Sequence, residues 1–148
     1  MTTDAFSQRF SVRWADLDAN AHMKNTAYME YAIQVRFAYF NHHGFSAQEF
    51  AKRQFGPVIF REEIAYFKEV HMLEEIDVTM LLGAINADAS RFALVNQIFK
   101  ADGQKAASVR TEGAWFDRKT RKLIAPPQEL AAILLNLKRT DDFQAIEK

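Results

Sequence analysis

One stretch of the sequence, Thr26 to His43, restricts the possible folds more than any other. It has the length of a helix, contains neither Gly nor Pro, and is followed by Gly44, a residue well suited to end a helix. Its large apolar side chains do not form one narrow stripe: Tyr28, Tyr31, Ile33, Val35, Phe37, Tyr39 and Phe40. Because a helix that is apolar nearly all round is usually enclosed, we expect the rest of the chain to wrap around it.

The ends of the helices have recognisable signals. Asn25 or Thr26 is the expected N-cap of the long helix, since both side chains can accept a hydrogen bond from a free backbone amide. Ser46 and Glu49 have the spacing of a capping box, which predicts a short second helix from Ala47 to about Arg53.

The period of the apolar residues changes to two beyond Pro57, which predicts strands. The apolar positions fall into four groups: Val58, Phe60, Ile64, Tyr66 and Val70; Ile76, Val78, Met80 and Leu82; Phe92, Leu94 and Ile98; Val109, Thr111, Gly113 and Trp115. A further strand is expected over Arg9–Trp14, and Asp102-Gly103 is typical of a hairpin turn. Pro126-Pro127 should precede a last helix from Gln128 to about Leu137.

This order of elements predicts an α+β fold. Strands that follow one another and pair through hairpins form a largely antiparallel sheet, and one enclosed helix beside it implies a sheet curled around that helix. The 148 residues suit a single domain over 1–148 with a substantial core.

Composition excludes several classes of function. Lys plus Arg and Asp plus Glu number 19 each, so the zero net charge argues against broad nucleic-acid binding. Without cysteine, disulfides, thiolate catalysis and Cys-zinc sites are impossible. The N-terminus lacks a signal-peptide core and no long apolar run predicts a membrane span, so we expect a cytoplasmic protein. No histidine pair has zinc-like spacing near further ligands, so no metal site is expected.

The sequence DLDANAHMKN, Asp16 to Asn25, interrupts the regular patterns between the first strand and the long helix. The spacing Asp18-x-Asn20-x-His22-x-x-Asn25-x-x-Tyr28, followed by a hydrophobic helix, resembles the hotdog-fold acyl-CoA thioesterases of the 4-hydroxybenzoyl-CoA thioesterase-like family. It is also similar to the plant acyl-carrier-protein thioesterases. The segments IAYFKEVHMLEEIDV and GAWFDRKTRKLIAPPQEL look similar to later parts of the same family, so the resemblance covers nearly the whole chain.

Three positions depart from the family pattern. Leu73-Glu74-Glu75 stands where a Gly-Asp turn is common, and Lys24 replaces the first residue of an Asn-Asn pair. Glu69-Val70 stands where the plant enzymes have a Glu-Cys pair, so no thiol can act there.

The resemblance implies a hotdog fold and hydrolysis of an acyl- or aroyl-CoA thioester to the free acid and coenzyme A. Asp18 matches the catalytic carboxylate, which acts as general base or as nucleophile. The unpaired amides at the start of the following helix suit a thioester oxygen that gains negative charge. His22 is expected to orient Asp18 or a water, or to protonate the leaving thiolate. Asn20 completes the expected catalytic set, either by holding the loop or by a hydrogen bond to the substrate carbonyl. Asp16 is expected to hold the loop.

Further residues are expected to meet the substrate. Asn25 is assigned to substrate binding or to capping, Tyr28 to the acyl pocket or the core, and Glu69 to the site or to an exposed strand position. The basic turn Arg118–Lys122 is expected to be solvated, with contact to coenzyme A phosphates as the alternative. Coenzyme A enters only as part of the substrate, with no separate cofactor. In the family the site lies between subunits, so a homodimer or homotetramer is expected.

Two other functions stay open. A non-catalytic acyl-CoA-binding protein would have the same fold and affinity without turnover. An acyl-thioester hydratase or dehydratase is disfavoured, because such enzymes place a catalytic histidine before the acid, whereas here His22 follows Asp18.

Overall fold

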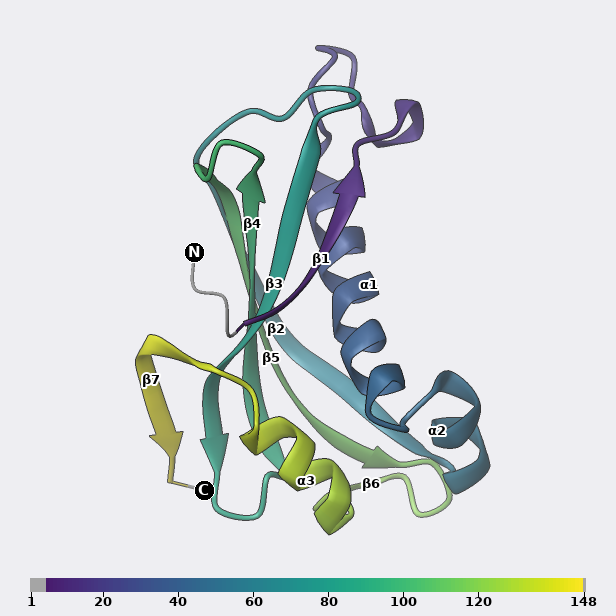
Figure 1. Cartoon of the computed structure of the whole chain (residues 1–148). Helices are drawn as coiled ribbons and strands as arrows, with labels where there is room; N and C mark the ends of the chain where they lie inside the picture. Colours follow the sequence, from purple (N-terminus) through teal and green to yellow (C-terminus); the bar gives the residue numbers. More distant parts are fainter. Residues whose placement is uncertain (1–4, 148) are drawn as a thin grey trace.

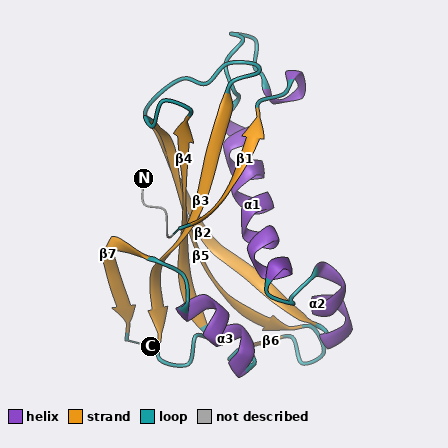
Figure 2. Cartoon of the chain, in the orientation of Figure 1, coloured by secondary structure: helices purple, strands orange, loops and turns teal. Residues whose placement is uncertain are grey.

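The computed structural model describes residues 5–147, and the regular elements of that part of the chain are three helices, one short 3-10 turn and seven strands. Figure 2 distinguishes the helices, strands and loops by colour. In chain order they are β1 (Phe6–Ser11), η1 (Trp14–Asp16), α1 (Asn25–His42), α2 (Ala47–Arg53), β2 (Phe55–Tyr66), β3 (Glu75–Asn86), β4 (Arg91–Lys100), β5 (Lys105–Asp117), β6 (Lys122–Ile124), α3 (Gln128–Leu135) and β7 (Arg139–Ile146). In the described chain, no helix is both long enough and apolar enough to cross a membrane.

The strands form one curled sheet in the order β1-β3-β4-β5-β2, with antiparallel pairing between all neighbours. The helix α1 runs along one face of this sheet and contacts β1, β3, β4 and β5 (Figure 1). The α+β architecture and the curled sheet around a long helix are therefore confirmed. The β4–β5 hairpin turns at Gly103, whose φ of +89° suits glycine.

The long helix is enclosed on one side only. Its buried residues face the sheet: Ala27, Tyr28, Tyr31, Ala32, Val35, Arg36, Tyr39 and Phe40. Ile33 and Phe37 lie on the other side, each 41% exposed. The expectation of enclosure all round was thus wrong for a single chain, because no element of the described chain covers that side of α1.

The start of α1 differs from the expected cap. The N-cap is Lys24, whose extended backbone makes no side-chain capping bond, and Asn25 is already the first helical residue. The helix ends as predicted before Gly44, which has a φ of +93°. Ser46 caps α2 as predicted, with its Oγ accepting a hydrogen bond from the Glu49 amide at 3.1 Å.

Strand β2 departs from strict alternation. Its register with β5 shifts between Ile59 and Arg61, and the extra residue at this bulge is Phe60, which is 54% exposed. The pattern had placed Phe60 on the buried face and had extended the strand to Val70, whereas β2 ends at Tyr66.

Two short edge elements were not expected from the sequence. Strand β6 pairs with β5 after the polar turn, and β7 pairs in parallel with β3. The sequence of β7, RTDDFQAI, has no apolar alternation because most of its residues remain exposed or half-exposed.

The core between α1, α2 and the sheet centres on Trp115 of β5, which is fully buried. Its indole Nε1 donates to the backbone oxygen of Ala89 at 3.1 Å. Four phenylalanine rings surround it with centroids 5.2–6.0 Å away: Phe40, Phe50, Phe55 and Phe92. This aromatic cluster joins α1, α2 and three strands.

Replacing Trp115 by Ala should lower the free energy of unfolding by about 3–5 kcal/mol, because it removes a large buried side chain and leaves a cavity. Urea denaturation followed by far-UV circular dichroism measures this. The matched control is Trp14→Ala, since Trp14 is 80% exposed; it should change stability by at most about 0.5 kcal/mol. If Trp115→Ala and Trp14→Ala changed the free energy of unfolding equally, the assignment of Trp115 to the core would be contradicted.

Candidate active site

Two loops that are far apart in sequence lie side by side at one end of the molecule, at the top of Figure 1. We call residues 12–24 the motif loop and residues 67–74 the β2–β3 loop. The amide of Met23 donates to the oxygen of Val70 at 2.7 Å, and the amide of Leu73 donates to the oxygen of Val12 at 2.9 Å. Val12, Met23 and Val70 are all buried, so apolar contacts reinforce the backbone bonds.

A pocket of about 420 Å³ opens where the two loops meet the start of α1 and the end of β2. Nine residues line it: Asp18, His22, Met23, Asn25, Tyr28, Tyr66, Phe67, Lys68 and Glu69. Five of the six residues selected from the sequence are among them. The sixth, Asn20, does not line the pocket, and its backbone amide instead supports Asp18.

Asp18 is held by a local turn. Its Oδ1 accepts hydrogen bonds from the amides of Asn20 at 2.8 Å and His22 at 3.2 Å. The turn also requires a left-handed backbone at Ala21, with φ of +63°. Within residues 5–147, the second carboxylate oxygen of Asp18 accepts no hydrogen bond. One oxygen therefore fixes the carboxylate while the other is available to a ligand or a water.

The first turn of α1 supplies amide donors beside this carboxylate. The first amides of a helix have no acceptor within the helix, and they carry partial positive charge. Here the amide of Ala27 bonds to the oxygen of Lys24 at 3.0 Å, and among residues 5–147 the amides of Asn25 and Thr26 have no acceptor. Asn25 lines the pocket, so the first turn of α1 lies at the site.

His22 and Glu69 form a pair across the two loops. The Nε2 atom of His22 lies 3.3 Å from Oε2 of Glu69. This contact gives the imidazole a carboxylate partner, so its orientation is set by a residue of the other loop.

Tyr28 is at once a core residue and a wall of the pocket. It is buried, and its ring meets that of Tyr66 edge to face with centroids 5.1 Å apart. Burial raises the pKa of Tyr28, and the neighbouring Tyr66 and Asp18 raise it further. Tyr28 is therefore a neutral phenol at physiological pH.

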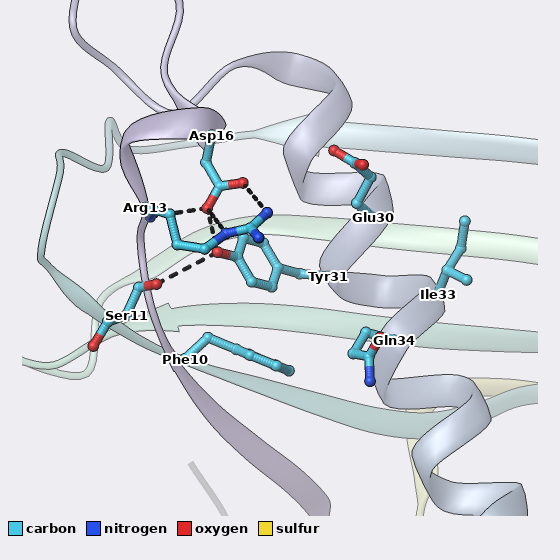
Figure 3. Close-up of a pocket in the computed structure, with 8 residues that line it drawn as sticks. All are labelled: Phe10, Ser11, Arg13, Asp16, Glu30, Tyr31, Ile33 and Gln34. Carbon is cyan, nitrogen blue, oxygen red and sulfur yellow. Dashed lines mark hydrogen bonds and ion pairs between the residues drawn. The ribbon is translucent and has the colours of Figure 1, made fainter.

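Asp16 does not line this pocket but a separate one, which it shares with Arg13 and Tyr31 (Figure 3). It is only 1% exposed and is fully engaged by its neighbours. Its carboxylate accepts hydrogen bonds from the backbone amide and the Nη2 atom of Arg13, each at 2.9 Å, and from the hydroxyl of Tyr31. Its backbone oxygen accepts the amide of Lys24 at 2.7 Å. Asp16 therefore ties the motif loop to α1, which is the scaffolding role expected of it.

These contacts change two pKa values. Burial by itself would raise the pKa of Asp16, but the hydrogen bonds from Arg13 and Tyr31 outweigh burial and hold it below its usual 3.8. Burial, followed by the hydrogen bond to Asp16, raises the pKa of Tyr31 to about 12. At neutral pH the pair is therefore a charged carboxylate and a neutral phenol.

Sequence reasoning missed the far wall of the pocket. Tyr66, Phe67 and Lys68 line it from the end of β2 and the β2–β3 loop. They lie about forty positions from the motif in a segment that reads as an ordinary strand, so only the pairing of the two loops identifies them.

The family model of the thioesterase-like superfamily matches residues 12–134, which includes both loops, α1 and the four long strands. The chain belongs to this superfamily. No curated protein matches the chain at a significant level.

Solved structures agree with the fold. A hypothetical protein from Staphylococcus aureus, in complex with CoA, has a TM-score of 0.81 at 21% identity, covering 92% of this chain and 87% of that one. A 1,4-dihydroxy-2-naphthoyl-CoA thioesterase from Synechocystis has a TM-score of 0.80 at 19% identity, covering 88% and 96%. A DHNA-CoA thioesterase from Staphylococcus aureus has a TM-score of 0.72 at 20% identity, covering 80% and 78%. Together with the curled sheet, these matches confirm the hotdog fold.

Tyr31→Phe should lower the free energy of unfolding by about 1.5–3 kcal/mol at pH 7, because a buried carboxylate loses a donor. The pKa of Asp16 is lower in the folded protein than in the unfolded chain, so its contribution to stability is complete above the unfolded pKa and disappears as the pH falls through the folded pKa. The stability lost in Tyr31→Phe should therefore shrink as the pH falls below about 4. Urea denaturation at pH 3 and pH 7 measures it.

The matched control is Tyr39→Phe on the same helix. The hydroxyl of Tyr39 donates to the backbone oxygen of Ile133, an acceptor that does not titrate. The stability lost in Tyr39→Phe should therefore be the same at pH 3 and pH 7. If Tyr31→Phe lost the same unfolding free energy at pH 3 as at pH 7, the proposed coupling to Asp16 would be contradicted.

Proposed function

We propose that the protein hydrolyses an acyl- or aroyl-CoA thioester to the free acid and coenzyme A. The observation that carries this proposal is the position of the Asp18 carboxylate, which lines a pocket with the first turn of α1 and has one oxygen without a partner among residues 5–147. Membership of the thioesterase-like superfamily supports the same chemistry.

Thioester hydrolysis requires a nucleophile and stabilisation of the oxygen that gains charge. Asp18 would either take a proton from a water that attacks the carbonyl carbon or attack it directly to give an acyl-enzyme anhydride that water then opens. In both routes the carbonyl oxygen becomes negative and would accept hydrogen bonds from the first amides of α1, of which Asn25 lies at the pocket.

His22 is the proposed proton donor to the leaving thiolate. The Oε2 atom of its carboxylate partner Glu69 lies 3.3 Å from Nε2 and holds the ring at the pocket wall. We assign Asn20 to supporting Asp18 through its backbone amide, and Asn25, Tyr28 and Glu69 to contacts with the substrate.

Coenzyme A is proposed to enter as part of the substrate, with no separate cofactor in the reaction. Support comes from a structural neighbour that is in complex with CoA and from another that is a naphthoyl-CoA thioesterase. The aromatic wall formed by Tyr28, Tyr66 and Phe67 suits an apolar or aryl acyl group.

The working unit is proposed to be a dimer or a tetramer. Strand β2 ends the sheet order, so in the described chain its outer edge has no partner strand. Such an edge can pair with another chain. Ile59 and Phe60 on β2 are exposed, as are Ile33 and Phe37 on α1. Because β2 leads directly to Tyr66, a second copy on this edge would lie close to the pocket.

Phe60→Lys should convert the oligomer to a monomer and lower kcat/KM at least tenfold, because a charge replaces an apolar contact at the proposed interface. Multi-angle light scattering gives the mass, and a thiol-release assay gives the rate. Leu135→Lys is the control: Leu135 is half-exposed on α3, away from β2, and should change neither value. A wild-type monomer that turns over at full rate would rule out the dimeric site.

Asp18→Asn should reduce kcat/KM for acyl- or aroyl-CoA by about 10²–10⁴, because asparagine keeps the turn but cannot act as base or nucleophile. The assay detects released thiol over a panel of acyl- and aroyl-CoA esters. Asp102→Asn is the matched control, since Asp102 makes the same kind of turn with the Gln104 amide at 3.0 Å; it should keep the wild-type rate.

Other outcomes identify the other functions. Affinity for coenzyme A esters without thiol release would indicate a binding protein. A change in enoyl absorbance without thiol release would indicate a hydratase or dehydratase. Full activity of Asp18→Asn would refute the catalytic role of that carboxylate.

A further inference from the structure

Three potential metal ligands meet where the motif loop crosses the β2–β3 loop. His22 comes from the first loop, and Glu69 and His71 come from the second. One ligand atom from each lies within 4.8 Å of the others. We propose that these three side chains bind one divalent transition-metal ion, with Zn²⁺ the best match.

The backbone places the three side chains on one face. His22 and His71 are opposite each other in an isolated antiparallel bridge, and directly opposed residues project to the same side. Glu69 and His71 flank Val70, which is fully buried. Since side chains alternate along an extended segment, Glu69 and His71 both point away from the core while Val70 points into it.

The distances suit a small metal ion. The Oε2 atom of Glu69 lies 3.3 Å from Nε2 of His22 and 3.9 Å from Nε2 of His71. Ligands about 2.0–2.2 Å from a tetrahedral Zn²⁺ are about 3.4 Å apart, so a small inward movement would complete the set. Glu69 and His71 are exposed, so their side chains can make this movement.

Glu74 provides a partner for one imidazole. The Nδ1 atom of His71 lies 3.0 Å from Oε2 of Glu74 and would donate its hydrogen to that oxygen. With its Nδ1 hydrogen directed at Glu74, the neutral imidazole would present Nε2 to a metal ion shared with Glu69 and His22. Glu74 is itself fixed by the backbone amide of His71 at 2.7 Å and by Nζ of Lys100 at 3.4 Å. Metal-binding histidines commonly have such a carboxylate behind them.

The chemistry of the set points to zinc rather than to calcium or magnesium. Two imidazoles and one carboxylate are among the ligand combinations that bind Zn²⁺ with a fourth position open to water, whereas Ca²⁺ and Mg²⁺ favour oxygen ligands. The chain has no cysteine to compete for a soft metal. The spacing along the sequence gave no indication of this site, because His22 and His71 meet only through the pairing of the two loops.

The test is titration of the metal-free full-length protein with zinc chloride by isothermal calorimetry, without substrate. One ion should bind per chain with a Kd in the micromolar range or tighter. Glu74→Gln should weaken binding about 10–100-fold, because it weakens the orientation and basicity of His71 without removing a ligand. His71→Ala should weaken binding at least as much.

The control is the double variant His42→Ala with His43→Ala, which removes the adjacent histidines at the end of α1 and should leave zinc affinity unchanged. Zinc should also raise the Tm of the wild type but not of His71→Ala. The proposal is overturned if no saturable binding occurs, if His71→Ala binds as tightly as the wild type, or if the double variant loses binding. With the ion bound, His22 would be a ligand and not the proton donor proposed above. Since no turnover is measured, the result of the zinc titration is separate from the test of Asp18.

Discussion

The burial of one side of α1 against the curled sheet is the constraint on which the remaining structure depends. Tyr31, Val35, Tyr39 and Phe40 must leave water, and they can do so only if the sheet bends around the helix. That packing fixes the position of the first turn of α1. The motif loop then has to span from β1 to this point, and the buried carboxylate of Asp16 holds it there.

Two acids two positions apart have opposite environments in this loop. Asp16 is buried and fully bonded by Arg13 and Tyr31, whereas Asp18 is bonded on one oxygen by two backbone amides and faces a pocket. Residue type and spacing could not separate a scaffold from a reactive group by themselves. What surrounds each carboxylate distinguishes the enclosed Asp16 from Asp18, and the catalytic role of Asp18 stays a proposal.

The sequence predicted α1, α2, α3 and the four long strands, because the strands alternate over many residues and the helices are bounded by Gly44, by the Ser46 cap and by Pro126-Pro127. It could not predict the bulge at Phe60, which depends on register with β5, or β7, whose polar sequence pairs only because β3 offers an edge. For the pocket, it identified the residues of the motif loop. Tyr66, Phe67 and Lys68 were missed, because proximity across about forty residues leaves no local pattern.

The backbone bonds between the motif loop and the β2–β3 loop also limit how the pocket can move. Met23 and Leu73 each donate across the junction, so neither loop can swing outward alone without breaking buried hydrogen bonds. Admission of a ligand therefore falls to side-chain rotation at the rim, where Tyr66 and Phe67 are about half-exposed. Rotamer changes of exposed side chains take picoseconds to nanoseconds, so this entrance would respond far faster than a hinged lid.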